Sequence, residues 1–588
     1  MRTTNKNCYH ASASDFKKIP GSPIAYWIHS SALKAFENAQ FLNDLIIARI
    51  ALATGDNSSF IRNWQEVSLA SIGFKISSSQ EASKSCKKWF PCNKGGNFRK
   101  WYGNNENLLN WENDGEKVKS LTDSETGRVR SHNYNGELGF QESVTWSALS
   151  SNKLGVRYSP KGFMFVTPGS SAFKKTDSVN LYGILSLLSS NIAFYFLQTI
   201  SATMNIEVGN ILSIPYLEPS QNISKLVSQT IQISQSDWDS YETSWDFTNL
   251  RLIVQAIGTK QPLEESYIQL CTRWRDTTLE MQKLEIKNNK IFIEAYGLQD
   301  ELTPDVPLEE ITLTCNPYYR YGKKCMNQEP SVFLEDPDLE ARLLADTMKE
   351  FISYAVGCMF GRYSLDKEGL ILANQGDTLE DYLKQVPTPT FTPDDDNIIP
   401  ILGGDWFADD ITGRFKQFLK VTFGAEHYDE NLAYIENAIG KDIQKYFLKD
   451  FYKDHWQRYK KRPIYWLFKS PKGNFSALIY MHRYKPDLVS KLLNDYLRDF
   501  KAKLEAHIQQ QNHISLSPSA SDKDKIKAGK EIEQAKKMLH DLEDYDRNIL
   551  YPLATQKIEI DLDDGVKVNY AKFGNALEKI PGLEDKEE

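Results

Sequence analysis

The stretch "PCNKGGNFRKWYGNNENLLNW", residues Pro91–Trp111, combines three glycines, an Arg-Lys pair, two tryptophans and six asparagines. The paired glycines Gly95–Gly96 let the backbone adopt positive φ or approach another group closely. Lys94, Arg99 and Lys100 supply cations for phosphate groups, and the asparagine amides offer the donor–acceptor pairs that suit adenine. The stretch therefore predicts a glycine-broken loop that contacts nucleic acid. The alternative is a structural loop that its aromatic residues anchor within a domain.

Positive charge is concentrated in two parts of a chain that is acidic as a whole. The 588 residues carry a net charge of −8. From Lys84 to Lys175, fifteen Lys and Arg stand against eight Asp and Glu, a net of +7, so the remainder has 55 against 70, or −15. A second basic block, Gln444–Lys485, has eleven cations against two aspartates. Such asymmetry indicates where an anionic partner binds rather than which fold is present.

Three further segments in the first part of the chain combine cations with hydrogen-bonding side chains. They are "ATGDNSSFIR" (Ala53–Arg62), "GRVRSHNYN" (Gly127–Asn135) and "VRYSPKGF" (Val156–Phe163). Each alone is also consistent with a solvated loop, but together they provide the backbone contacts and base-edge contacts of a DNA reader. The predicted DNA-binding residues are Asn57, Lys94, Gly95, Gly96, Asn97, Arg99, Lys100, Tyr102, Arg128, Arg130, His132, Arg157, Ser159 and Lys161, with Lys460, Lys461 and Arg462 from the second basic block.

The pattern of apolar residues predicts an α+β protein with four parts. Residues 1–220 mix short strands with helices, and "GVRYSPKGFMFVTPG" (Gly155–Gly169) predicts strand, turn and strand. Residues 221–385 are expected to be mostly helical, and the proline-rich segment 386–400 to be a linker with solvated carboxylates. Residues 401–588 are expected to form an α+β domain. It should contain a β-hairpin that turns at Ser470–Asn474 and a helical hairpin whose arms pack on each other or on the core.

The uncharged stretch Val179–Ile206 is long enough to span a bilayer. Its asparagines and serines favour a buried helix of a soluble domain instead. The N-terminal residues lack the apolar core of a signal peptide, and the seven cysteines contain no CxxC pair. This pattern argues against a zinc ribbon and a secreted disulfide framework, and we expect a reducing cytoplasm.

The segment "TCNPYYRYG", Thr314–Gly322, is close to a catalytic motif without matching it. Methyltransferases that modify the adenine amine use an Asn/Asp-Pro-Pro-Tyr/Phe loop, in which the amide holds the amine of the flipped base. Here Tyr318 stands in place of the second proline, and no acidic-x-Gly-x-Gly turn follows an apolar strand. We therefore interpret the segment as a turn and predict no catalytic, cofactor-binding or metal-binding residue. A complete enzyme that uses Asn316 is the alternative.

Several long segments of the chain carry a resemblance to one family. They are "FKKIPGSPIAYW" (Phe16–Trp27), "TGDNSSFIRNWQEV" (Thr54–Val67), "KGGNFRKWYGNNENLLNWENDG" (Lys94–Gly115), "TWSALSS" (Thr145–Ser151), "RYSPKGFMF" (Arg157–Phe165), "ISYAVGCMFGRYSLD" (Ile352–Asp366), "KRPIYWLFKSPKGNFSALIYMHRY" (Lys461–Tyr484) and "IDLDDGVKVNYAKFG" (Ile560–Gly574). These segments resemble PglX, the adenine-specific DNA methyltransferases of BREX and phage growth limitation defence systems. The resemblance covers nearly the whole chain and corresponds to the C-terminal half of that family.

The resemblance implies that residues 1–220 form a DNA target-recognition domain, followed by a helical spacer and a C-terminal domain. The Rossmann-like domain that binds S-adenosylmethionine belongs to the other half of the family, so this chain is expected to hold no Rossmann core, no cofactor and no activity by itself. The implied partners are duplex DNA, the N-terminal methyltransferase domain in the same or a separate chain, and other BREX proteins, without a membrane. A phage inhibitor that mimics DNA would fit the same basic surface. The alternative is a protein-interaction scaffold with little DNA binding, which the acidic C-terminal part and the helical hairpin favour.

Overall fold

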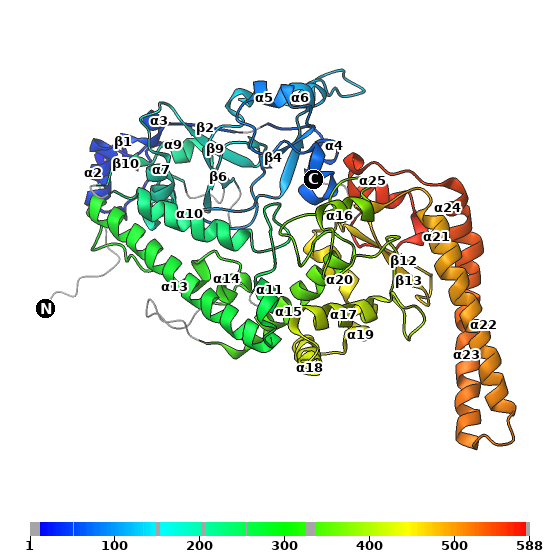
Figure 1. Ribbon diagram of the computed structural model, residues 1–588. Helices are drawn as coiled ribbons and strands as arrows, with labels where there is room; N and C mark the ends of the chain where they lie inside the picture. Colours follow the sequence, from blue (N-terminus) through cyan, green and yellow to red (C-terminus); the bar gives the residue numbers. More distant parts are fainter. Residues whose placement is uncertain are drawn as a thin grey trace. The chain divides into compact units, whose positions relative to one another are not determined.

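The computed structural model describes residues 12–50, 52–132, 135–148, 153–201, 206–219, 222–254, 256–324 and 335–583. The chain divides into two compact units, whose helices and strands are drawn in Figure 1. Unit 1 comprises Met1–Arg62, Ser71–Ser244 and Cys271–Glu340, and unit 2 comprises Asn63–Ala70, Trp245–Leu270 and Ala341–Glu588. Helices and several small sheets occur together, which confirms the predicted α+β class. The four-part division of the chain stays a prediction.

Two four-stranded sheets organise the first part of the chain. The first has the order β2 (Ile46–Arg49), β9 (Gly169–Lys174), β6 (Ser143–Ser147), β7 (Val156–Ser159) and is antiparallel throughout. The second has the order β3 (Ile61–Asn63), β5 (Asn107–Asn110), β4 (Trp89–Asn93), β8 (Met164–Phe165), and β4 and β8 run parallel. The strand, turn and strand predicted for Gly155–Gly169 are confirmed as β7 and β8, which belong to different sheets. A small two-stranded sheet pairs β1 (Gln40–Phe41) with β10 (Pro215–Tyr216).

Most helices of unit 1 are short, and several begin at polar residues whose side chains accept a free N–H of the first turn. Asp56, Ser78 and Asn180 cap α4, α5 and α7 in this way. The helices of unit 1 are α1 (Ala13–Phe16), α2 (Ser30–Asn38), α3 (Leu42–Leu45), α4 (Asn57–Phe60), α5 (Ser79–Lys84), α6 (Glu112–Lys119), α7 (Leu181–Leu188), α8 (Asn191–Ile200), α9 (Val208–Leu212), α10 (Ser224–Trp238), α14 (Pro317–Arg320) and the part of α13 (Leu263–Tyr296) from Cys271 onward.

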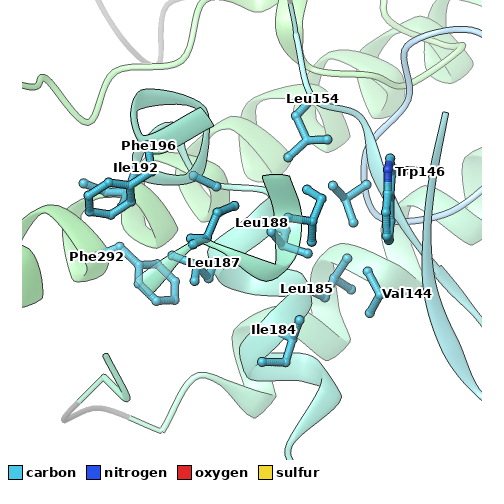
Figure 2. Packing of buried hydrophobic residues seen from close by; sticks show 14 of the residues in the cluster. Val144, Trp146, Leu154, Ile184, Leu185, Leu187, Leu188, Ile192, Phe196 and Phe292 are labelled. Atoms are coloured by element: carbon cyan, nitrogen blue, oxygen red, sulfur yellow. The ribbon is translucent and has the colours of Figure 1, made fainter. Parts of the chain in front are cut away.

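The uncharged stretch Val179–Ile206 contains two buried helices rather than the single helix predicted. Helices α7 and α8 separate at Ser189–Ser190 and are bent by 71°. Their apolar side chains lie in one cluster with Trp146 of β6 and Phe292 of α13, as Figure 2 shows. No single helix of the described residues is long and apolar enough to cross a membrane, and this pair reaches such a length only across its bend.

The β-hairpin predicted for unit 2 is confirmed. The sheet that contains it has the order β11 (Ile399–Pro400), β13 (Ser476–Tyr480), β12 (Tyr465–Lys469). Its turn is Ser470–Asn474, and the buried carboxylate of Asp541 holds this turn. The carboxylate accepts hydrogen bonds from the Ser470 hydroxyl (2.7 Å), the Lys472 N–H (3.0 Å) and the Asn474 amide (2.9 Å). A residue of a later helix therefore fixes the local turn.

Unit 2 is otherwise helical, and two of its long helices, α22 and α23, form the predicted hairpin. Helices α22 and α23 lie side by side and project as a pair (Figure 1); we call them the helical arm. Leu504 and Ile532 are buried within the arm, whereas Leu516 and Ile526 near its tip are 82% and 63% exposed. The helices of unit 2 are α11 (Arg251–Val254), α12 (Ala256–Thr259), α15 (Pro337–Met359, from Ala341 onward), α16 (Leu379–Gln385), α17 (Ile411–Phe423), α18 (Tyr428–Ile439), α19 (Ile443–Lys449), α20 (Phe451–Arg458), α21 (Leu488–Lys491), α22 (Asp499–Leu516), α23 (Asp522–Tyr545), α24 (Tyr551–Gln556) and α25 (Gly565–Ala571).

Candidate nucleic-acid interface

The glycine-broken loop leaves β4 and comprises residues Lys94–Phe98; we call it the glycine loop. Gly95 and Gly96 have φ of +91° and +126°, which confirms the positive φ predicted for them. A Cβ on Gly96 would lie 2.8 Å from the Asn104 amide nitrogen, which itself donates to the Asn97 carbonyl at 2.9 Å. Gly96 and Asn97 are exposed, whereas Gly95 is buried. The DNA contact predicted for Gly95 is therefore corrected to a conformational role.

Arg99 follows the glycine loop but points into unit 1 rather than to its surface. Its guanidinium lies 3.4 Å from an Asp237 carboxylate oxygen, donates to the Thr314 hydroxyl at 2.6 Å, and covers the Trp238 ring at 4.9 Å. The residue is only 5% exposed. A guanidinium enclosed by these partners does not reach a DNA phosphate, so the prediction for Arg99 is corrected. The sequence around Arg99 gives no sign of this ion pair, because Asp237 lies 138 residues away.

Lys100 is likewise an interior group. Its ammonium pairs with the Glu285 carboxylate of α13, which also accepts the Trp101 indole N–H at 2.9 Å. The Lys100 backbone N–H donates to the Thr312 hydroxyl at 3.0 Å. Burial raises the pKa of Glu285, and the neighbouring ammonium opposes that rise. The phosphate contact predicted for Lys100 is therefore wrong, because the cation is 5% exposed and already neutralised.

Three other predicted contacts are also buried. Arg157 is 2% exposed, and its burial lowers the pKa of the guanidinium to about 10. The Ser159 hydroxyl accepts a hydrogen bond from the Asn93 amide at 2.8 Å. Tyr102 belongs to the apolar core of unit 1. The structure corrects all three predictions, since these side chains support the sheets and do not face solvent.

Arg128 and Arg130 lie on an exposed hairpin, residues 121–132, which we call the arginine ribbon; its two sides share one antiparallel β-bridge, Thr122–Val129. Backbone hydrogen bonds join the two sides, including Arg130 N–H to Leu121 O at 2.8 Å. At the tip, Asp123 accepts the Thr126 N–H and the Thr126 hydroxyl, both at 2.9 Å, and these bonds hold the pKa of Asp123 below its usual value. Sequence inspection overlooks Asp123, although Asp-Ser-Glu-Thr-Gly is typical of such a turn. The ribbon thus presents two exposed arginines on a fixed backbone.

The turn that contains Asn57 supports the arginine ribbon from one side. Ala53 and His132 exchange backbone hydrogen bonds of 3.1 and 2.9 Å. Gly55 has a φ of +75°, and a Cβ added there would lie 2.9 Å from the carbonyl carbon and the Cβ of Arg130. The Asn57 amide oxygen accepts a threonine hydroxyl of the same turn at 2.9 Å. The structure therefore brings the predicted residues Asn57, Arg130 and His132 close together.

We expect Gly55→Ala to weaken duplex binding by roughly tenfold, because the added methyl group displaces Arg130, one of the predicted DNA-binding residues. Fluorescence anisotropy with a labelled mixed-sequence duplex measures the change. Gly322→Ala is the matched control, since Gly322 has a φ of +64° but nothing within 4 Å of an added Cβ. Equal affinities of the two variants would contradict the role assigned to Gly55.

The remaining predicted cations have mixed environments. Arg462 places its Nε 3.9 Å from a carboxylate oxygen of the buried Glu66, so part of its charge is already engaged. Four others reach the surface of their own unit: the half-buried Lys94 and the exposed Lys161, Lys460 and Lys461. Their contact with DNA stays a prediction.

The side-chain amide of Asn316 makes its hydrogen bonds with backbone groups of its own segment. It is fully buried, and its amide nitrogen donates to the carbonyls of Leu308 (2.7 Å) and Ile311 (2.8 Å). Its amide oxygen accepts the Tyr318 N–H at 3.1 Å and caps α14. An adenine amine donates hydrogen bonds, so it would need the Asn316 amide oxygen as acceptor, but that oxygen caps α14 and belongs to a fully buried residue. The amide is therefore not presented to a base. This geometry agrees with the interpretation of the segment as a structural turn.

The acidic segment 386–400 contains a carboxylate cluster in which Asp394 is buried, Asp396 half-buried and Asp395 exposed, so the prediction of solvated linker charges is wrong for Asp394. Carboxylate oxygens of Asp394, Asp395 and Asp396 lie within 4.8 Å of one another, and Asp394 is 3% exposed. The Ile398 N–H donates to Asp394 at 3.1 Å, and the Tyr496 hydroxyl donates to Asp396 at 3.0 Å. Burial, then the charge of Asp396, raises the pKa of Asp394 to about 7.

The raised pKa of Asp394 makes the stability of unit 2 depend on pH. Its folded value lies above the ordinary 3.8, so the folded state binds the proton more tightly than the unfolded chain. The stabilisation that this proton provides is complete below the pKa of Asp394 in the unfolded chain. It is lost as the pH rises through the pKa of Asp394 in the folded state. The free energy of unfolding should fall by up to about 1.4 kcal/mol per pH unit between about pH 5 and pH 7.

Asp394→Asn should flatten that slope in urea unfolding followed across the same pH range. Asp381→Asn is the control, because a hydrogen bond with Lys384 lowers the pKa of Asp381 to about 2, well below the window. A slope that is unchanged in the Asp394 variant would show that another group binds the proton.

Comparison with known proteins shows which family the chain resembles. No family model matches it. The "Adenine-specific methyltransferase PglX" of Lacticaseibacillus casei (strain Zhang) is 38% identical over 581 residues, which cover 96% of this chain and 45% of that protein. The "Adenine-specific methyltransferase BrxX" of Escherichia coli O9:H4 (strain HS) is 35% identical over 595 aligned positions, which cover 98% of this chain and 46% of that protein.

The chain therefore spans about half the length of the curated relatives that it matches. The similarity covers 96–98% of the chain and therefore extends through both structural units. Over almost its entire length, the chain is similar to about half of each of these two adenine-specific methyltransferases.

Proposed function

We propose that the chain recognises duplex DNA and presents an adenine to a separate S-adenosylmethionine-dependent domain of a BREX anti-phage methyltransferase. The names of both relatives support an adenine-specific methyltransferase as the whole enzyme. The residues described here hold the duplex and fix its register. The catalytic domain, in the same or a separate polypeptide, transfers the methyl group to adenine N6, which marks host DNA as self.

The arginine ribbon is the observation on which this proposal depends. A two-stranded antiparallel ribbon fits the major groove of B-DNA, where arginine binds the guanine edge through two parallel hydrogen bonds. Arg128 and Arg130 are exposed, and in the part of the chain that the structure describes neither makes an ion pair. Asp123 fixes the tip through three hydrogen bonds from Glu125 and Thr126. Each bidentate contact with a base would contribute about 1–3 kcal/mol of discrimination.

Phosphate contacts would come from the other accessible cations. Lys94 stands at the start of the glycine loop and Lys161 on the turn between β7 and β8. Lys460 and Lys461 follow α20 in unit 2 and are exposed. Lysine ammonium groups bind phosphate as point charges and release condensed counterions, so duplex binding should weaken steeply with salt.

Methyl transfer is assigned to another domain because Asn316, in the segment Thr314–Gly322 that is close to the catalytic motif, offers no amide that could bind a base. The full burial of Asn316, whose amide oxygen already accepts the Tyr318 N–H, supports this assignment. S-Adenosylmethionine would supply the methyl group in the intact enzyme. The role of this chain is to bind the duplex and to orient the target site toward that domain.

Two measurements test the proposal. Anisotropy of a labelled duplex should show binding that is strong at about 50 mM salt and much weaker at about 200 mM salt. Calorimetry of the isolated chain should show no binding of S-adenosylmethionine. Absence of duplex binding at low salt would overturn DNA recognition. Methyl transfer by the chain alone, abolished by Asn316→Ala, would overturn the assignment of catalysis to another domain.

A protein-interaction scaffold for other BREX components is the second candidate, and the helical arm favours it. Leu516 and Ile526 expose apolar surface near the tip of the arm, as contact residues of protein interfaces do. Capture of BREX proteins from nuclease-treated extract, together with no duplex binding, would select this function. Loss of capture after Leu516→Ser and Ile526→Ser would assign the contact to the arm.

A further inference from the structure

We infer that Tyr319, Asp237 and Glu285 are positioning residues that hold the glycine loop in the conformation that meets DNA. This inference rests on the proposed function, in which Lys94 of that loop contacts a phosphate. None of the three residues reaches the DNA itself. They act through Phe98, Arg99 and Lys100, the residues at the downstream end of the loop.

The upstream end of the glycine loop is fixed by the sheets. The Asn93 amide donates to the Ser159 hydroxyl at 2.8 Å, and the Asn93 carbonyl accepts the Val166 N–H at 2.9 Å. Both partners come from the segment that contains β7 and β8. Inside the loop, the Ser147 hydroxyl donates to the Gly96 carbonyl at 2.9 Å. The start of the loop therefore has a defined position.

The downstream end of the loop is fixed by residues far away in the sequence. The Tyr319 hydroxyl donates to the Phe98 carbonyl across 221 positions. The Asp237 carboxylate accepts the Thr314 N–H at 2.7 Å and the Cys315 N–H at 2.9 Å, and it also pairs with Arg99. Asp237 therefore binds the loop end and, at the same time, the segment that leads to Tyr319.

Glu285 fixes the chain two residues after Phe98, at Lys100. Its carboxylate holds the Lys100 ammonium and the Trp101 indole, so residues 100 and 101 are attached to α13. Only the four residues 94–97 separate Asn93 from Phe98, the residues at which the two ends are anchored. A loop of this length cannot move at its downstream end without displacing Lys94, Gly96 or Asn97, which face the solvent or lie half-buried at the surface.

Tyr319→Phe tests the inference with little disturbance, because it removes one hydroxyl and keeps the ring. Tyr296→Phe is the matched control, since the hydroxyl of Tyr296 in the same unit donates to the Pro215 carbonyl at 2.6 Å and accepts the Leu217 N–H at 3.0 Å, and neither partner belongs to the loop. We expect Tyr319→Phe to weaken binding of a labelled mixed-sequence duplex by about three- to tenfold, and Tyr296→Phe to leave it unchanged. Thermal unfolding confirms that each variant is folded.

A double-mutant cycle separates positioning from general destabilisation. Lys94→Ala should weaken binding less in the Tyr319→Phe background than in the natural chain, because the displaced loop has already lost that contact. Arg128→Ala, on the separate ribbon, should weaken binding equally in both backgrounds. Additive effects of Lys94→Ala and Tyr319→Phe, within about twofold, would overturn the inference.

The remaining outcomes distinguish this inference from the proposed function. Normal binding by Lys94→Ala, with weaker binding by Arg128→Ala, would remove the glycine loop from the interface and overturn the inference alone. Absence of duplex binding by the natural chain would overturn the proposed function as well. Thr312→Val, which removes the acceptor of the Lys100 N–H, gives a second variant for the cycle if Tyr319→Phe does not fold.

Discussion

Replacing Arg128 and Arg130 together with alanine should weaken binding of a mixed-sequence duplex by about one hundredfold at low salt. The two guanidinium groups are exposed, and the ribbon that carries them is already ordered by Asp123. Little conformational entropy is therefore lost when the ribbon enters a groove. If both arginines contact phosphates instead of bases, the slope of log affinity against log salt should fall in magnitude by about 2.

Lys117→Ala with Lys119→Ala is the matched control for the arginine pair. It removes the same charge from helix α6, which directly precedes the ribbon, but these lysines already pair with Glu112 and Asp114. The control should bind DNA nearly as well as the natural chain. Equal losses in the two double variants would indicate that only the net charge of the region matters.

Glu285→Leu should lower the free energy of unfolding by about 3–5 kcal/mol, because it leaves the Lys100 ammonium buried without a counter-charge. The Trp101 indole N–H also loses its acceptor. The effect should exceed that of any exposed ion pair, which contributes about 0–1 kcal/mol. Urea unfolding of the full chain, followed by tryptophan fluorescence, measures the difference.

The double variant Lys100→Met with Glu285→Leu should recover most of that loss. Removal of both charges leaves an apolar contact of similar volume, and such exchanges of a buried ion pair are often nearly neutral. A double variant as unstable as Glu285→Leu alone would indicate that packing volume, rather than the unpaired charge, sets the stability at this position.

Local patterns in the sequence predicted the elements that local interactions determine. The hairpin turn at Ser470–Asn474 follows from its turn residues between two aromatic and β-branched runs, and it forms as expected. The helical arm follows from apolar residues at helical spacing. The positive φ of Gly95 and Gly96 was also predictable, because glycine alone adopts such conformations without strain.

The interior cations were not predictable from the same sequence. Arg99 and Lys100 stand in a polar, glycine-rich stretch that is typical of the surface. Their carboxylate partners lie 138 and 185 residues away, so only the tertiary structure shows that the charges are neutralised. The same reason explains Asp394, whose run of aspartates and prolines suggests a solvated linker until the packing of Tyr496 and Arg483 around it is known.

A loop of five exposed or half-buried residues, Ser517–Ser521, connects the two helices of the helical arm. Both ends of this connection lie on adjacent helices, and chain insertions are tolerated best at such loop tips. A fluorescent protein or an affinity peptide grafted there would therefore report on the molecule in living cells without entering either core.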